Sequence, residues 1–261
     1  AKTIASWGCE FFKYDFCHHN RISGDCPAIE HIVITKPKSA FEIDLRPEDA
    51  EFTGRAKIIK MSDVPSKKAI GFISHGSGSA SFNFDADEKG EYVLTFVFHK
   101  SMAKKKQYMQ IHINGKMYEI FFPETKGFSP LGRQQIIVEL KEGTNNMTIK
   151  NPVATAIDSS YIQYKRMGNA LKEASSMWAK VTHSEEKPIT YSICEWGMAR
   201  PYLWGAKAGS MWRTTPDIAP NWRSITMIYN RTLKLYKHSG PGHWNDPDML
   251  EVGNGKLDKK K

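Results

Sequence analysis

The middle of the chain, from about residue 31 to residue 163, has a different residue pattern from the segments on either side of it. Short runs in which apolar and polar residues alternate recur there between turn residues, as in EYVLTFVFH and QQIIVEL. The segment INGK, from Ile113 to Lys116, places Asn-Gly between two such runs, which is a strong hairpin signal. Roughly eight short strands of this kind, with YIQY (161–164) as the last, predict an all-β module of the sandwich type.

The two flanks instead alternate between strand and helix patterns. The first contains a helix end, the strand CEFFKYD and a polar loop. The second contains helical spacing in YKRMGNALKEASSMW, the strand PITYSICEW and a further helical pattern after DIAPNW. Strands that alternate with helices predict a parallel sheet. We therefore expect a first α/β piece at 1–30, an inserted β-sandwich at 31–163 and a second α/β piece at 164–261.

Composition and charge argue against several classes of function. A hydrophobic share of 40% and a charged share of 25% are ordinary for a globular protein, and no apolar run approaches the ~18–20 residues of a membrane span. The net charge of +9 comes from scattered lysines rather than from one basic face, so we expect no nucleic acid and no membrane as partners. The four cysteines match no zinc-binding spacing.

Charged residues follow four strand ends in the α/β flanks. In parallel sheets, ligands bind at the carboxyl ends of the strands, so these side chains are candidates for one site. Each also has a structural alternative: Asp217 follows Pro216 and could cap a helix, and the DPD sequence is common in turns. The candidates are Lys13, Asp15, Cys194, Glu195, Trp196, Arg213, Asp217, Asp246 and Asp248.

Tryptophan and tyrosine lie beside these carboxylates, a combination that suits sugars, which offer apolar C–H faces as well as hydroxyls. Two carboxylates that flank a glycosidic bond can hydrolyse it, one attacking the anomeric carbon and the other protonating the leaving oxygen. A retaining enzyme needs the two about 5–5.5 Å apart. Asp15 and Asp217 lie 202 positions apart in the sequence, so only the fold can bring them together.

Four segments carry a resemblance to a known family: WGCEFFKYDFC, YSICEWGMARPYLWG, GSMWRTTPDIAPNWRSI and GPGHWNDPDMLEVGNG. They resemble, in the same order, the signature segments of glycoside hydrolase family 27, the α-galactosidases and α-N-acetylgalactosaminidases. The resemblance covers about residues 1–22 and 164–256. It implies a retaining glycosidase with a (β/α)8 TIM barrel, of which this chain carries about strands four to seven.

The resemblance also implies roles for individual residues. Asp15 matches the nucleophile and Asp217 the acid/base. Glu195 in CEW is similar to the galactosidase form, in which this residue lies by the 2-hydroxyl, so galactose is favoured over N-acetylgalactosamine. The positions similar to substrate-binding ones are Lys13, Cys194, Glu195, Trp196, Arg213 and Asp248. The implied substrates are α-galactoside oligosaccharides or glycoconjugates, and no cofactor is expected for catalysis.

Physical chemistry adds expectations about three of these residues. Lys13 lies two residues before Asp15, on the same side of the strand, where its charge favours an ionised nucleophile. Asp217 has to be protonated at rest, so we expect it in a drier site or near another carboxylate. Arg213 would oppose that state by pairing with Asp217, so we expect it to point to the sugar instead.

Two features depart from the family pattern. A full barrel takes about 250 residues, and roughly 125 residues of barrel sequence remain outside the insert. We therefore expect the remainder of the barrel, with its missing strands, to be needed as a partner for catalysis, because a half-barrel exposes unpaired strand edges. The rival function is a non-catalytic glycan-binding protein that acts through the sandwich.

The insert itself resembles carbohydrate-binding modules of the jelly-roll type. Such modules often hold calcium near their first and last strands, so Glu48, Glu51 and Asp158 are candidates for a structural calcium site, with solvated strand edges as the alternative. A sugar site would need exposed loop aromatics, and Phe128 and Tyr118 both remain possible.

Overall fold

The computed structural model describes residues 1–16, 21–62, 64–99, 106–123, 131–255 and 257. The chain divides into two compact units, one made of Ala1–Arg21 with Ala156–Lys261 and the other of Ile22–Thr155. We call them the barrel unit and the sandwich unit. A β-rich segment thus interrupts an α/β unit, as the change in residue pattern along the sequence predicted. The junctions at Arg21 and Ala156 lie earlier than the expected boundaries at 30 and 164.

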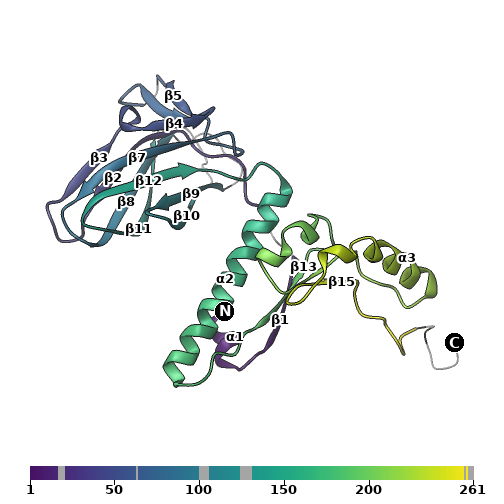
Figure 1. The fold of residues 1–261 in the computed structure, drawn as a ribbon. Helices are drawn as coiled ribbons and strands as arrows, with labels where there is room; N and C mark the ends of the chain where they lie inside the picture. Colours follow the sequence, from purple (N-terminus) through teal and green to yellow (C-terminus); the bar gives the residue numbers. More distant parts are fainter. Residues whose placement is uncertain (17–20, 63, 100–105, 124–130, 256, 258–261) are drawn as a thin grey trace. The chain divides into compact units, whose positions relative to one another are not determined.

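The barrel unit is built on a four-stranded parallel sheet in the order β1-β13-β14-β15 (Figure 1). Strands that follow one another along the unit lie next to each other, with helices or loops between them, which is the arrangement of one part of a (β/α)8 barrel. Its elements are α1 (Lys2–Ser6), β1 (Phe11–Asp15), α2 (Ala156–Thr182), β13 (Thr190–Cys194), η2 (Pro201–Leu203), η3 (Gly205–Lys207), β14 (Met211–Arg213), α3 (Trp222–Leu233), η4 (Tyr236–His238) and β15 (Trp244–Asp246).

The strand register gives this sheet one apolar and one polar face. Residues paired across parallel strands point to the same side, and alternate residues point to opposite sides. Aromatic and aliphatic side chains on one face form a core with Tyr164 and Leu171 of α2; the sheet supplies Phe12, Tyr14, Tyr191, Ile193 and Trp212. The other face carries Lys13, Asp15, Ser192, Cys194, Arg213 and Asp246.

Two expectations about elements of the barrel unit are wrong. YIQY lies in the helix α2, because Tyr161 and Tyr164 continue the helical spacing of Leu171, and four residues cannot distinguish the two periods. The cap of α3 is Asn221, whose side chain accepts a hydrogen bond from the Ser224 N–H at 2.9 Å, so Asp217 does not cap it.

The sandwich unit consists of antiparallel strands in two sheets with a shared core. The sheets have the orders β10-β9-β12-β7-β4 and β11-β8-β2-β6-β5, and β3 also pairs with β2. The elements are β2 (Ile29–Thr35), β3 (Glu42–Leu45), η1 (Pro47–Asp49), β4 (Glu51–Gly54), β5 (Lys57–Lys60), β6 (Lys68–Gly71), β7 (Gly78–Ala86), β8 (Gly90–His99), β9 (Gln107–Ile113), β10 (Lys116–Phe122), β11 (Leu131–Leu140) and β12 (Gly143–Lys150).

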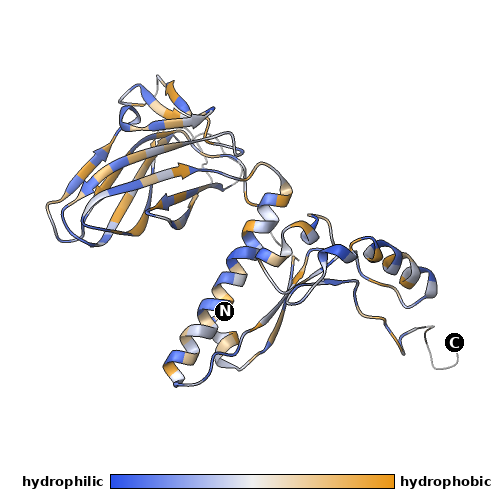
Figure 2. Ribbon diagram, viewed as in Figure 1, coloured by the Kyte–Doolittle hydropathy of each residue, from blue (hydrophilic) through white to orange (hydrophobic). Residues whose placement is uncertain are grey.

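Apolar and polar residues alternate along these strands, as the alternating colours in Figure 2 show, and the apolar side of each sheet is buried. Along β8, for example, Tyr92, Leu94, Phe96 and Phe98 are buried in the core between the sheets. The predicted Asn-Gly hairpin joins β9 to β10, with Asn114 at φ 50° and Gly115 at φ 83°, as a type I′ turn requires. None of the helices in the described part of the chain has the length and apolar character to cross a membrane.

Candidate active site

The nucleophile candidate Asp15 ends β1 directly beside the end of β13. Asp15 and Cys194 are register partners, and the Cys194 thiol donates a hydrogen bond to Oδ2 of Asp15 at 3.6 Å. Burial, and then the nearby Asp15 carboxylate, raise the pKa of that thiol to about 11. Cys194 therefore stays a neutral donor at physiological pH. Lys13 lies on the same face of β1, as its spacing predicted.

Arg213 holds two of the candidate carboxylates. Its side chain is 2% exposed, and its Nη2 lies 2.8 Å from Oδ2 of Asp248 and 3.1 Å from Oδ1 of Asp217. The expectation that Arg213 points to the sugar rather than to Asp217 is therefore wrong. The Asp217 side chain is 63% exposed, so it does not lie in a dry site. It does lie near a second carboxylate, because Asp248 shares the same guanidinium nitrogen.

Asp248 and Trp196 adopt backbone conformations that side chains disfavour. Their φ angles are 90° and 58°, and such strain in a non-glycine residue is concentrated at functional sites. Asp248 is held on several sides: its N–H donates to Oδ1 of Asp246 at 2.8 Å, and its Oδ2 accepts from the N–H of Ile218 at 3.0 Å. These bonds fix Asp248 against Arg213.

Two residues belong to this site although the candidate substrate-binding set leaves them out. Asp246 pairs in register with Arg213 and so lies on the same polar face. Its place in the DPD sequence, two residues before Asp248, is the sequence feature that could have identified it. Tyr164 donates a hydrogen bond to the carbonyl of Cys194 at 2.8 Å and so fixes the end of β13. Nothing in the local sequence could indicate this contact, because the two residues lie 30 positions apart.

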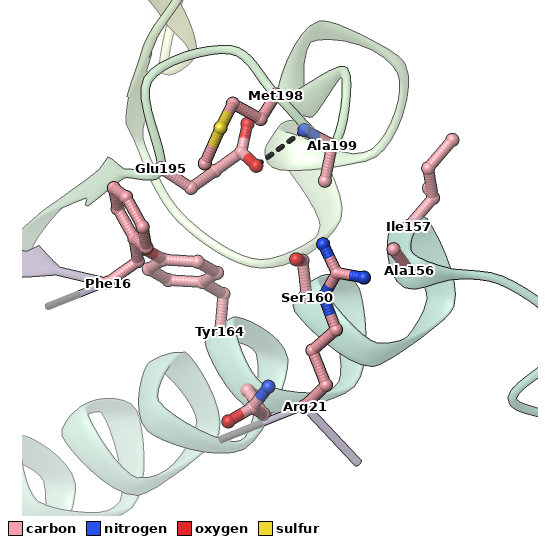
Figure 3. Close-up of a pocket in the computed structure, with 10 residues that line it drawn as sticks. Phe16, Arg21, Ala156, Ile157, Ser160, Tyr164, Glu195, Met198 and Ala199 are labelled. Atoms are coloured by element: carbon pink, nitrogen blue, oxygen red, sulfur yellow. Dashed lines mark hydrogen bonds between the residues drawn. The ribbon is translucent and has the colours of Figure 1, made fainter. Parts of the chain in front are cut away.

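Glu195 is buried in a different direction from the Arg213 cluster. Its side chain lines a cavity of about 190 Å³ with residues of α2 (Figure 3), and the residue is 3% exposed. Oε2 accepts a hydrogen bond from the N–H of Ala199 at 2.6 Å. Burial raises the pKa of Glu195 to about 7, and the Ala199 N–H opposes this rise. Glu195 therefore carries a proton for much of the time near neutral pH.

Buried polar atoms without a hydrogen-bond partner concentrate at these strand ends. Native proteins pair nearly all such atoms, so an unpaired group needs an explanation such as a ligand. Every unpaired buried side-chain atom in the described residues lies on β13 or β14 or directly after β13: Tyr191 Oη, Ser192 Oγ, Glu195 Oε1, Trp196 Nε1 and Arg213 Nε. Ser192 and Arg213 lie on the polar face of the sheet, whereas Tyr191 lies on the apolar face against α2.

The two expected catalytic carboxylates stand on different strands. Asp15 ends β1, Asp217 follows β14, and β13 lies between these strands. Two strand spacings amount to about 9–10 Å, so the carboxylates have to lean toward each other across the end of β13 to act on one bond.

The predicted calcium ligands do not form a group in one unit. Glu48 lies in η1 and pairs with the Lys68 ammonium, and Glu51 begins β4. Asp158 lies in α2 of the barrel unit rather than near the last strand of the sandwich, so its assignment to the sandwich is wrong. Among residues that the structure describes, no three His, Cys, Asp or Glu side chains gather as a metal site would require.

The two aromatic candidates for a sugar site in the sandwich have different outcomes. Tyr118 is half-buried and packs against the sandwich core, and its hydroxyl accepts a hydrogen bond from the Glu139 N–H at 3.0 Å. It is therefore not a free loop aromatic. Phe128 lies outside the described residues.

Comparisons with known proteins find similarity to alpha-galactosidases. Residues 154–261 match the family model described as alpha galactosidase A. An alpha-galactosidase from Cyamopsis tetragonoloba is 45% identical over 98 residues, which are 36% of this chain and 24% of the relative. Alpha-galactosidase 2 of Arabidopsis thaliana is 39% identical over 103 residues, covering 38% of this chain and 26% of the relative.

Two solved structures are similar to parts of the chain. A putative alpha-galactosidase/melibiase from Bacteroides fragilis is 34% identical, covers 40% of this chain and 21% of its own, and has a TM-score of 0.32. A family 35 carbohydrate binding module from Clostridium thermocellum is 18% identical, covers 41% of this chain and 83% of its own, and has a TM-score of 0.38.

The chain spans about a quarter of the length of the first curated relatives that it matches. The matched part includes three of the four motifs and the polar strand ends of β13, β14 and β15. Residues 154–261 are therefore similar in sequence to alpha-galactosidases, as the motifs indicated.

Proposed function

We propose that the barrel unit supplies the catalytic carboxylates of a retaining α-galactosidase. One observation carries the proposal: four adjacent parallel strands bring Asp15, Cys194, Arg213 and Asp246 to the same edge of one polar face. The unpaired buried Nε of Arg213 and Nε1 of Trp196 support it, because they lack the partners that a hydroxylated ligand would supply.

Asp15 and Asp217 divide the chemistry between them. The Asp15 carboxylate attacks the anomeric carbon while the glycosidic bond breaks and its oxygen takes a proton from Asp217. Water then attacks the glycosyl-enzyme and gives its proton to Asp217, and the C–O bond to Asp15 breaks, which restores both groups. The Cys194 thiol stabilises the ionised Asp15 through its hydrogen bond.

Arg213 pairs with two carboxylates, and one of them belongs to Asp217, the proposed acid. One guanidinium faces two carboxylates, so the group of Arg213, Asp217 and Asp248 has an excess negative charge when both carboxylates are ionised. Asp217 is the more exposed of the two, with 63% of its side chain accessible against 8% for Asp248, so it is the carboxylate that is open to a substrate.

The proposed substrates are α-galactoside oligosaccharides or glycoconjugates, with galactose preferred to N-acetylgalactosamine because Glu195 takes up the room beside the 2-hydroxyl. The reaction uses no cofactor. The proposed partner is the remainder of the barrel, because four strands do not close one.

Hydrolysis of an aryl α-galactoside by the full chain, combined with the remainder of the barrel, tests this proposal, with the α-N-acetylgalactosaminide alongside. We expect turnover of the galactoside, and a loss of about 10³-fold or more in Asp15→Asn, since a catalytic carboxylate is removed without change of shape. If Asp15→Asn hydrolyses the galactoside as fast as the wild type does, the proposed role of Asp15 as nucleophile is contradicted. No turnover of either substrate would overturn catalysis by this chain.

Glycan binding through the sandwich unit is the second candidate function. The observation that favours it is that Ile22–Thr155 forms a compact unit with its own core. Binding of the full chain to immobilised glycans tests it, and Asp15→Asn should leave such binding unchanged.

A structural calcium ion in the sandwich stays a prediction that rests on Glu48 and Glu51. If the sandwich holds calcium, its unfolding temperature rises with added calcium and falls with a chelator. The rise should be smaller in Glu51→Gln, and equal melting curves under both conditions would contradict the prediction.

A further inference from the structure

The carbonyl oxygen of Cys194 accepts two hydrogen bonds where β13 ends. The N–H of Phe16 donates to it at 3.0 Å and the hydroxyl of Tyr164 donates to it at 2.8 Å. A carbonyl oxygen has two lone pairs, so these two donors satisfy it fully. One atom thus joins the chain that leaves β1, the end of β13 and the helix α2.

Cys194 also contacts the proposed nucleophile through its side chain. The Cys194 thiol donates to Oδ2 of Asp15 at 3.6 Å, and Phe16, which bonds to the Cys194 carbonyl, directly follows Asp15. A thiol is a weak donor, so its bond to a carboxylate depends on where the backbone of the cysteine places it. Any shift of the Cys194 carbonyl therefore moves the thiol relative to Asp15.

Other aromatic rings hold the ring of Tyr164 in place. Tyr164 is fully buried, and its ring centroid lies 6.0 Å from that of Tyr14 and 5.9 Å from that of Trp204. Burial raises the pKa of Tyr164 far above its usual value, so its hydroxyl stays protonated and can donate. The direction of its hydrogen bond to Cys194 is therefore set by packing.

Helix α2 packs closely enough in the barrel unit to fix the position of this ring. Gly168 lies one turn after Tyr164, and a Cβ added to it would lie 2.1 Å from the carbonyl oxygen of Ala208, just before β14. Only glycine permits so close an approach of a helix to another backbone. The contact at Gly168 therefore holds Tyr164 against the end of β13.

We propose that Tyr164 is a positioning residue for the nucleophile: its hydroxyl holds the Cys194 carbonyl so that the thiol donates to Asp15. This inference rests on the proposed function and deepens it. Tyr164 lies outside the four segments that resemble the glycosidase family, and it comes from α2 rather than from the sheet that carries Asp15 and Cys194. Removing its hydroxyl leaves the packed ring in place and takes one of two donors from the Cys194 carbonyl.

The S–H stretching vibration of Cys194 measures this link without any need for catalysis. Its frequency falls when the thiol donates a hydrogen bond, and it lies in a part of the infrared spectrum where other protein groups absorb little. Subtracting the spectrum of Cys194→Ala from that of the full chain isolates this band from those of the other cysteines. With the same subtraction, Tyr164→Phe should move the band to higher frequency, toward the band in Asp15→Ala, in which the acceptor is removed.

Tyr161→Phe is the matched control. Tyr161 lies three residues earlier in the same helix, and its ring packs against Trp204 with the centroids 5.8 Å apart. This variant also loses a tyrosine hydroxyl from α2, but the donor to Cys194 is Tyr164. It should therefore leave both the S–H band and the turnover unchanged. Melting curves check that each variant is folded.

Hydrolysis of the aryl α-galactoside by the full chain, combined with the remainder of the barrel, measures the effect on catalysis. Tyr164→Phe should lower kcat about tenfold with little change in KM, because it disturbs the orientation of the nucleophile and not the binding of the sugar. In a Cys194→Ala background the same substitution should have no further effect, since Tyr164 acts through the thiol.

The two measurements separate this inference from the proposed function. If the S–H band of Tyr164→Phe stays at the wild-type frequency, the inference is overturned, whether or not the galactoside is hydrolysed. An unchanged kcat in Tyr164→Phe, or a further loss in the Cys194→Ala background, also overturns it. If the wild type hydrolyses neither substrate and the band still moves, the proposed function is overturned, whereas the control of the thiol by Tyr164 is supported.

Discussion

At the scale of the residue, Glu195 couples stability to pH. Its pKa is raised from 4.5 to about 7 because burial disfavours the charged form. The folded state therefore holds a proton that the unfolded state releases between these values. The contribution is fully present below pH 4.5 and is lost as the pH rises through about 7.

Chemical denaturation of the wild type and Glu195→Gln between pH 4 and pH 8 measures this effect. The amide is neutral throughout, so the variant should gain on the wild type by up to about 3 kcal/mol over this interval. Parallel pH profiles for the two proteins would contradict the raised pKa.

Arg213 is the second residue whose removal should be costly. Its guanidinium is 2% exposed and faces Asp248, which is 8% exposed, so Arg213→Met leaves a buried carboxylate without its partner. We expect a loss of about 3–5 kcal/mol in the free energy of unfolding. Lys187→Met breaks the exposed pair with Glu10 and should cost less than about 1 kcal/mol. Similar losses in the two variants would show that the Arg213 pairs are not buried in solution.

At the scale of the element, the loop after β13 depends on one glycine. Gly197 has φ 75°, and a Cβ there would lie 2.2 Å from the carbonyl oxygen of Thr214. Gly242 has φ 80° with nothing within 4 Å of a Cβ. Both alanine variants incur the left-handed penalty of about 1–2 kcal/mol. Only Gly197→Ala also clashes, so it should lower the melting temperature clearly further than Gly242→Ala, and equal losses would contradict the close approach of the loop to Thr214.

The type of an element could be predicted wherever its repeat of apolar residues extended over enough positions to distinguish a strand from a helix. The alternation in EYVLTFVFH predicted β8, and Asn114-Gly115 predicted the β9–β10 turn. YIQY was misassigned because four residues fit a strand as well as a helix turn, and only its continuation to Leu171 shows the helical period. The pattern after DIAPNW predicted a helix, but its start at Trp222 depends on the Asn221 cap.

At the scale of the whole molecule, the division into two units predicts independent folding of the sandwich. Ile22–Thr155 has a core of its own, formed by residues such as Ile32, Phe96 and Ile111. A fragment of residues 22–155 should therefore unfold cooperatively and give dispersed amide signals in NMR. Phe96→Ala, which removes a fully buried ring, should cost about 3–5 kcal/mol and serves as a control for a packed core. Collapsed amide signals in the fragment would contradict its independence.

The sequence by itself determined the alternation of strands and helices, the interruption by a β module, and which residues end the parallel strands. These follow from local periodicity and from motif order, and both are properties of the sequence alone. The tertiary structure alone decided that Arg213 pairs with Asp217 and Asp248, and that Glu195 is buried against α2. Such contacts join residues far apart in the chain, and they depend on strand register and on side-chain direction, which no local pattern encodes.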